Sequence, residues 1–99
     1  MSYQLKISLT AYQEIDDAYA YYEEQSIGLG ERFLESLEDA YVKLSQTPQF
    51  YGFIQYDKNI RDIKIKTFPF VIIFQIVGNT VLVLRVFNSN RNPESLKRL

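Results

Sequence analysis

The chain has 99 residues, 46% of them hydrophobic, and a formal net charge of −1. These values predict one folded domain over residues 1–99 and argue against disorder. The absence of cysteine and histidine excludes disulfides and thiolate chemistry, and it removes the commonest general base and metal ligand. We therefore expect no metal site and no cofactor.

The charges divide unevenly along the chain. Residues 1–55 hold three cations and nine anions, a net charge of −6, and residues 56–99 hold eight cations and three anions, a net charge of +5. The basic second half suggests a polyanionic or acidic partner. The alternative is that Glu keeps the helices soluble and Lys keeps the sheet soluble.

A strand and two helices are predicted in the first half. Residues 3–9 alternate between apolar and polar and predict a half-buried strand. Thr10 is the expected N-cap of a first helix over residues 11–26, with Gln13 as its capping-box partner. Helical spacing of apolar residues predicts a second helix over residues 29–46, ended by Thr47-Pro48. Gly28 separates the two helices, which should form an antiparallel hairpin.

The second half has the pattern of a sheet. Residues 49–59 are aromatic but aperiodic and are interpreted as a loop. Residues 60–66 alternate, with Arg61 expected on the same face as Ile63 and Ile65, and Lys64 and Lys66 on the other. Residues 68–77 and 80–88 are apolar on both faces, as in central strands, and Gly78-Asn79 between them is a hairpin signal. These interruptions make two strands a better interpretation of the apolar stretch 67–84 than a membrane span.

The predicted fold class is α+β. Its order is β-α-α-β-β-β, a helical hairpin packed on one face of a mainly antiparallel sheet. No segment typical of a signal peptide opens the chain, so a cytoplasmic location is expected. The oligomeric state and the position of the first strand in the sheet are left open.

The chain resembles the RelE/ParE superfamily of bacterial type II toxins in four ordered patches. A tyrosine–glutamate helix end (residues 20–25) precedes a Gly-Leu-Gly step (28–33), and Pro48 closes the second helix before an aromatic loop. Ile60-Arg61 and the Phe68-Pro69-Phe70 segment with Phe74 are similar to the family's strand arginine and Phe-Pro-Tyr segment. The run 86–93, which ends in Arg91-Asn92-Pro93, is similar to the family's terminal block.

The resemblance implies a plasmid-stabilisation toxin that a cognate antitoxin silences. ParE-type members poison DNA gyrase, whereas RelE-type members cleave messenger RNA on the ribosome. Asn88 stands where many members have histidine, and Phe70 replaces a frequent tyrosine. These departures and the resemblance together favour the ParE-like branch and growth inhibition by binding.

The alternative of a ribosome-dependent mRNA endonuclease needs a proton acceptor, a proton donor and cations for the phosphorane charge. Arg61, Arg85 and Arg91 are the candidate catalytic cations, and Asp62 and Glu94 are possible bases. The expected target-binding or antitoxin-binding residues are Arg61, Lys64, Lys66, Arg85, Asn88 and Arg91. A second alternative is a non-toxic member that only binds an antitoxin.

Arg85 draws most attention because it lies between apolar neighbours in a predicted central strand. An arginine at such a position needs a partner or an open face. One interpretation is an ion pair with a carboxylate, either Asp62 or one from the helices, and the other is an open face that contacts a target or antitoxin. The exposed aromatics Phe50, Tyr51 and Phe53 are interpreted as the lid of the core, with a partner site as the alternative.

Overall fold

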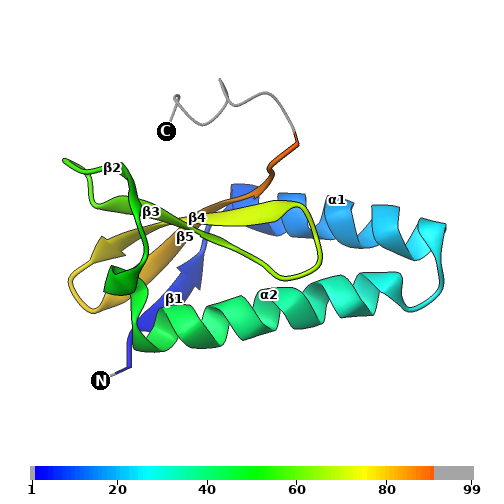
Figure 1. The fold of residues 1–99 in the computed structure, drawn as a ribbon, viewed down its shortest axis with the longest axis horizontal. Coiled ribbons are helices and arrows are strands. Elements are labelled where there is room, and N and C mark those ends of the chain that lie inside the picture. Colours follow the sequence, from blue (N-terminus) through cyan, green and yellow to red (C-terminus); the bar gives the residue numbers. More distant parts are fainter. Residues whose placement is uncertain (1, 91–99) are drawn as a thin grey trace.

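The computed structural model describes residues 2–90, which form two helices and a five-stranded sheet (Figure 1). In chain order the elements are β1 (Gln4–Ile7), α1 (Leu9–Gln25), α2 (Leu29–Gln46), the 3-10 helix η1 (Pro48–Phe50), β2 (Phe53–Gln55), β3 (Ile60–Lys64), β4 (Phe70–Val77) and β5 (Thr80–Asn88). The strand order across the sheet is β1-β5-β4-β3-β2. Strand β1 runs parallel to β5, and every other neighbouring pair is antiparallel. The α+β prediction is confirmed, with one strand more than expected.

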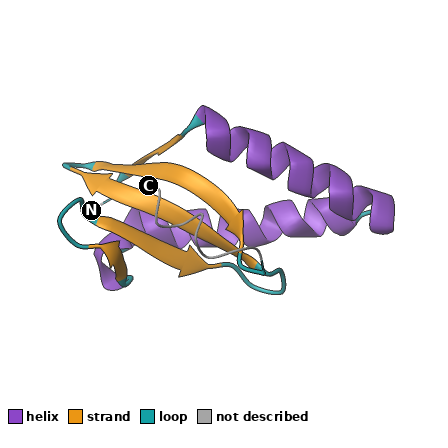
Figure 2. Ribbon diagram, turned by 90° about the horizontal axis from the view of Figure 1, so that it is seen from above, coloured by secondary structure: helices purple, strands orange, loops and turns teal. Residues whose placement is uncertain are grey.

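The two helices cover one face of the sheet (Figure 2). Their apolar sides meet alternate residues of the strands in the main core, which includes Ala11, Phe33, Leu44, Phe74 and Val83. An aromatic cluster of Tyr22, Phe33, Phe68 and Phe70 fills one end, with ring centroids 4.8 to 6.2 Å apart in edge or tilted contacts. A smaller apolar cluster, Ile60, Val71, Ile73 and Phe87, lies on the opposite face.

The predicted start of α1 was wrong. The helix begins at Leu9, and its N-cap is Ser8, whose Oγ accepts a hydrogen bond from the Ala11 backbone N–H at 3.0 Å. Thr10 lies inside the first turn of the helix, so the predicted capping box of Thr10 and Gln13 is wrong. The physical reason is tertiary, because Ser8 Oγ also donates to the Leu84 carbonyl at 2.8 Å and so joins the helix start to β5.

Glu23 shapes the junction between the two helices. Its carboxylate accepts hydrogen bonds from the backbone N–H groups of Gly28 and Gly30, at 3.0 and 2.9 Å. These donors belong to the N-terminal end of α2, which would otherwise lack partners. Gly28 has φ of +90°, a conformation that favours glycine, and this turn lets α2 run back along α1.

Residues 49–59 are not a simple loop. They contain the end of η1 and the three-residue strand β2, which pairs with β3 in an irregular register. Three residues without alternation are too few to produce a strand signal. The structure confirms the helix over residues 29–46, the last strand over residues 80–88 and the Gly78-Asn79 turn. Strands β3 and β4 are shorter than the predicted strands 60–66 and 68–77, because a turn that includes Thr67, with φ of +75°, separates them.

Candidate functional site

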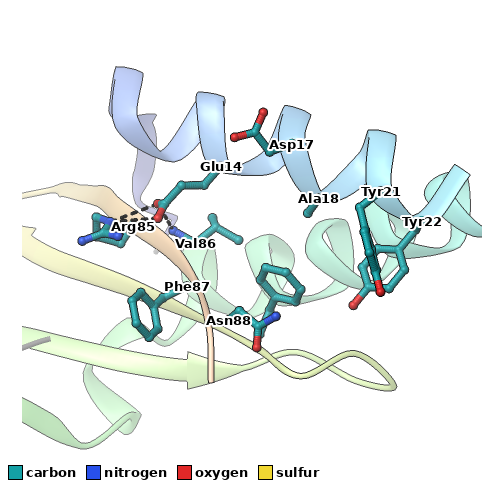
Figure 3. Close-up of a pocket in the computed structure, with 10 residues that line it drawn as sticks. Glu14, Asp17, Ala18, Tyr21, Tyr22, Arg85, Val86, Phe87 and Asn88 are labelled. Carbon is teal, nitrogen blue, oxygen red and sulfur yellow. Dashed lines mark hydrogen bonds and ion pairs between the residues drawn. The ribbon is translucent and has the colours of Figure 1, made fainter. Parts of the chain in front are cut away.

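A groove of ≈ 550 Å³ lies between α1 and the second half of β5 (Figure 3). The wall from α1 carries Glu14, Asp17, Ala18, Tyr21 and Tyr22. The opposite wall carries Phe70 and residues 85–88 of β5. Apolar rings and charged or amide groups share this surface, as is typical of a binding site.

The groove exists because β1 is shorter than β5. Strand β1 pairs only with residues 80–83 of β5, so no strand within residues 2–90 lies beside the rest of β5 on that edge. The chain leaves the sheet at Ser8, whose N–H donates to the Val83 carbonyl at 2.9 Å, and continues into α1. Helix α1 therefore becomes the neighbour of the open edge of β5.

A β-bulge decides which way Arg85 points. Val83 pairs with Phe74 and Arg85 pairs with Ile73, so Leu84 is the extra residue in β5. Simple alternation from Val81 and Val83 would direct Arg85 into the core beneath the helices. The bulge instead places Val86 in that core and Arg85 on the other face of the sheet, with Phe87.

Glu14 holds Arg85 at the edge of the sheet. Arg85 Nη2 donates to Glu14 Oε2 at 2.7 Å, and Arg85 Nε donates to both carboxylate oxygens at 3.0 and 3.1 Å. Glu14 Oε1 also accepts the Val86 backbone N–H at 2.9 Å. The hydrogen bonds to Glu14 raise the pKa of Arg85 above its usual value, so the guanidinium stays charged. The guanidinium also lies 5.4 Å from the centre of the Phe87 ring.

The expectation of a carboxylate partner for Arg85 is therefore confirmed, and the partner comes from a helix. Asp62 is not that partner. In the strand register Asp62 pairs with Ile73, which pairs with Arg85, so the two charged residues are two strands apart. The Glu14–Arg85 contact is the single ion pair among residues 2–90.

Arg61 lies away from the groove and organises the β2–β3 end of the sheet. Its Nη1 donates to the backbone carbonyls of Gln49 and Tyr51 at 2.8 and 2.6 Å, and its Nε donates to Asn59 Oδ1 at 3.1 Å. The guanidinium lies 3.8 Å from the centre of the Phe53 ring. These contacts hold the aromatic segment whose members Phe50, Phe53 and Tyr56 are exposed.

The other predicted site residues fall into separate places. Lys64 is exposed on β3, on the face of the sheet opposite the helices, and Lys66 is exposed in the turn after β3. Asn88 lines the groove together with Arg85. Arg91 and Glu94 lie outside the described residues. The structure thus brings together Arg85 and Asn88 but not Arg61, and it places Lys64 on the face shared by Arg85.

Sequence reasoning missed Glu14 and the groove tyrosines. Glu14 sits next to Ala18 on the helical wheel, beside the apolar stripe of α1, and a carboxylate at that edge often reaches a tertiary partner. That position was a usable signal. No group of three or more acidic side chains that could hold a metal ion occurs among residues 2–90.

Comparison with known proteins places this fold in a family. The model of the family described as "ParE toxin of type II toxin-antitoxin system, parDE" matches residues 5–93. The chain belongs to the ParE toxin family. The match covers both helices, the groove and all of the sheet except Gln4.

A solved structure described as the chromosomal ParDE TA system from P. aeruginosa contains a chain with the same ParE-like fold. The TM-score is 0.76, the sequence identity is 18%, and the alignment covers 88% of this chain and 96% of that chain. No curated protein matches the sequence. No helix within residues 2–90 of this ParE-family chain is long and apolar enough to cross a membrane.

Proposed function

We propose that this chain is the toxin of a type II toxin–antitoxin pair, that it arrests growth by binding DNA gyrase in the cytoplasm, and that a cognate antitoxin neutralises it. The observation that carries the proposal is the family match over residues 5–93. Gyrase is the target that the resemblance to ParE-type members implies. The antitoxin is the partner expected of a toxin from such a pair.

Inhibition by binding is supported by how the described arginines are used. A cation that stabilises a phosphorane must face the substrate and be free to contact its oxygens. Arg85 is held by Glu14, and three of the hydrogen-bond donors of Arg61 bind neighbouring protein groups. Both arginines therefore have internal structural roles that need no substrate.

The exposed lysines are the proposed contacts to the target. Lys64 is the last residue of β3, Lys66 lies two residues further on in the turn, and both are exposed. We expect Lys64→Ala with Lys66→Ala to weaken growth arrest. Lys43→Ala, at an exposed position on α2, is the matched control and should arrest growth as the wild type does.

One observation favours a ribonuclease as the second candidate. Burial raises the pKa of Asp62 above its usual value. The charge of Lys64 and a hydrogen bond to the Asp62 backbone lower the pKa, but by less than burial raises it. A carboxylate with a raised pKa accepts a proton more readily and suits a general base. Asp62→Asn is the variant that examines this role, because it keeps the side-chain shape and cannot take the proton.

The deciding experiment induces the chain alone and follows growth, DNA supercoiling and message integrity in one culture. Arrest with DNA breaks or altered supercoiling and intact messages supports the gyrase proposal. Purified chain should then inhibit purified gyrase. Arrest with cut messages that Asp62→Asn abolishes would instead support the ribonuclease. Absence of arrest would leave a non-toxic member that only binds its antitoxin.

A further inference from the structure

We propose that the open edge of β5 from Val86 to Asn88 is the docking site for an extended segment of the antitoxin. The segment adds as a sixth strand in line with β1, and it brings a basic side chain to Asp17. This inference rests on the proposed function, because it names where and how the neutralising partner binds.

The hydrogen-bonding groups of β5 point into the groove at alternate residues. The Val86 N–H turns away from β4, because it donates to Glu14. The Ser89 N–H turns toward the other side, because it donates to the Pro69 carbonyl at 2.7 Å. Backbone groups two residues apart in a strand point the same way, so the Val86 carbonyl and both backbone groups of Asn88 face the groove.

The hydrogen bonds of Phe70 at the start of β4 also indicate that the backbone groups of Asn88 face the groove. The Phe70 carbonyl accepts from the Ile65 N–H, so Phe70 directs its backbone groups away from β5. Its neighbour Val71 then exchanges hydrogen bonds with Phe87, the residue opposite it in the register. Among residues 2–90, the N–H and the carbonyl of Asn88 are consequently left without a partner strand on the open edge, where another chain can pair.

The dimensions of the groove suit a short extended segment. Its wall on α1 runs from Glu14 to Tyr22, and these eight steps along the helix span about 12 Å at 1.5 Å each. An extended chain covers that length with about four residues. Glu14 occupies the Val86 N–H, so pairing uses the Val86 carbonyl and the two groups of Asn88.

The charges in the groove select a basic occupant. Arg85 compensates Glu14, and within residues 2–90 no ion pair engages Asp17. Asp17 therefore leaves one uncompensated negative charge in the groove, whereas the neighbouring Asp16 is exposed but does not line the groove. Tyr21, which is 58% exposed, and Tyr22 offer ring surface for an apolar side chain of the same segment.

A proline substitution tests the edge itself. Asn88→Pro removes the N–H on the open edge and leaves the hydrogen bonds to β4 in place, as edge strands tolerate. Asn88→Ala removes the same side chain but keeps that N–H, so it is the matched control. The probe is the small protein encoded by the neighbouring reading frame, with binding measured by calorimetry. We expect Asn88→Pro to weaken binding at least tenfold and Asn88→Ala to stay within threefold of the wild type.

Amide hydrogen exchange gives a test that needs no variant. The Asn88 amide should exchange at least tenfold more slowly in the complex than in the free toxin. Equal exchange rates would overturn the proposal. A second result would also overturn it: slow exchange of the Asn88 amide in the free toxin that becomes fast when the chain is truncated after Asn90. The toxin's own terminal residues would then occupy the edge. Protection that grows with toxin concentration alone would point to a second copy and would also overturn it.

The charge is tested by a second matched pair. Asp17→Asn should weaken binding and reduce its dependence on salt, whereas Asp16→Asn, outside the groove, should change neither. Failure of the wild-type toxin to bind the neighbouring protein would overturn the proposed function together with the docking site. Tight binding that Asn88→Pro leaves unchanged would overturn the docking site alone.

Discussion

Gly30 lies so close to Tyr19 that a Cβ atom at position 30 would come within 2.8 Å of Cδ2 of the tyrosine ring and 3.0 Å of the Tyr19 backbone oxygen. The contact joins the start of α2 to the last turns of α1. The Tyr19 hydroxyl in turn donates to Glu31 Oε1 at 3.1 Å, which restrains the ring. The Gly-Leu-Gly step of the sequence therefore serves the close packing of the two helices.

Gly30→Ala should lower the free energy of unfolding by about 1–3 kcal/mol, the usual cost of overpacking. Urea denaturation followed by circular dichroism measures the effect. Gly52→Ala is the matched control, because a Cβ there would meet no atom within 4 Å, and its effect should stay within about 0.5 kcal/mol. An unchanged midpoint for Gly30→Ala would show that the helices can separate at no cost.

Glu23→Gln should destabilise the helical hairpin. The amide oxygen still accepts a hydrogen bond, but the negative charge near the N-terminal end of α2 is lost. We expect a loss of about 0.5–2 kcal/mol, seen as a lower melting temperature. Glu24→Gln removes an exposed carboxylate from the same helix and should leave the melting temperature within error of the wild type.

The Glu14–Arg85 pair should show a measurable coupling energy. Glu14→Ala leaves the Val86 N–H and the guanidinium without their acceptor, at a cost of about 1–3 kcal/mol. Glu14→Gln should cost less, because its oxygen still accepts from Val86. A double-mutant cycle with Arg85→Ala should give a coupling of about 0.5–3 kcal/mol that falls as salt increases, since both side chains are about a quarter exposed. Additive single effects would argue against the pair as a unit.

Tyr41 makes the fold sensitive to alkali. Burial, with smaller contributions from Tyr12 and Glu38, raises the pKa of its hydroxyl from 10.0 to about 12. The folded state then favours the neutral hydroxyl. The stability linked to this group is complete below pH 10 and is lost as the pH rises from 10 to about 12.

Tyr41→Phe should therefore flatten the loss of stability above pH 10, measured as urea midpoints across that range. At pH 7 the variant should equal the wild type or gain up to about 1 kcal/mol, because the buried hydroxyl has no hydrogen-bond partner within residues 2–90. Tyr56→Phe, at an exposed position, should keep the wild-type dependence on pH. The same loss in both variants would contradict the assignment to Tyr41.

The elements that the sequence predicted well are long and periodic. Helix α2 has apolar residues at helical spacing over 18 residues, and β5 follows a clear turn, so both were predicted with correct bounds. Strand β2 was missed because three residues are too few to show an alternating pattern. Its position depends on Arg61, which donates to the carbonyls of Gln49 and Tyr51, just before β2 in the chain. The cap of α1 was misplaced because Ser8 is fixed by β5, far away in the chain.

The site was predictable only where local chemistry demanded a partner. Arg85 between apolar neighbours required a partner or an open face, and the structure gives it the carboxylate of Glu14. The bulge at Leu84 was not predictable, because it depends on the register between β4 and β5 rather than on any residue type. The groove depends on where β1 ends relative to β5, a relationship between the two ends of the sequence.

The parallel pairing of β1 with β5 also sets an order in time. Gln4 lies opposite Thr80, so β1 has no strand to pair with until β5 emerges from the ribosome. At about 5–20 residues per second, that wait lasts roughly 4 to 15 seconds. A chain interrupted before β5 has neither the Glu14–Arg85 pair nor the groove. Such a nascent chain has no finished sheet, and the groove can form only after β5 has been synthesised.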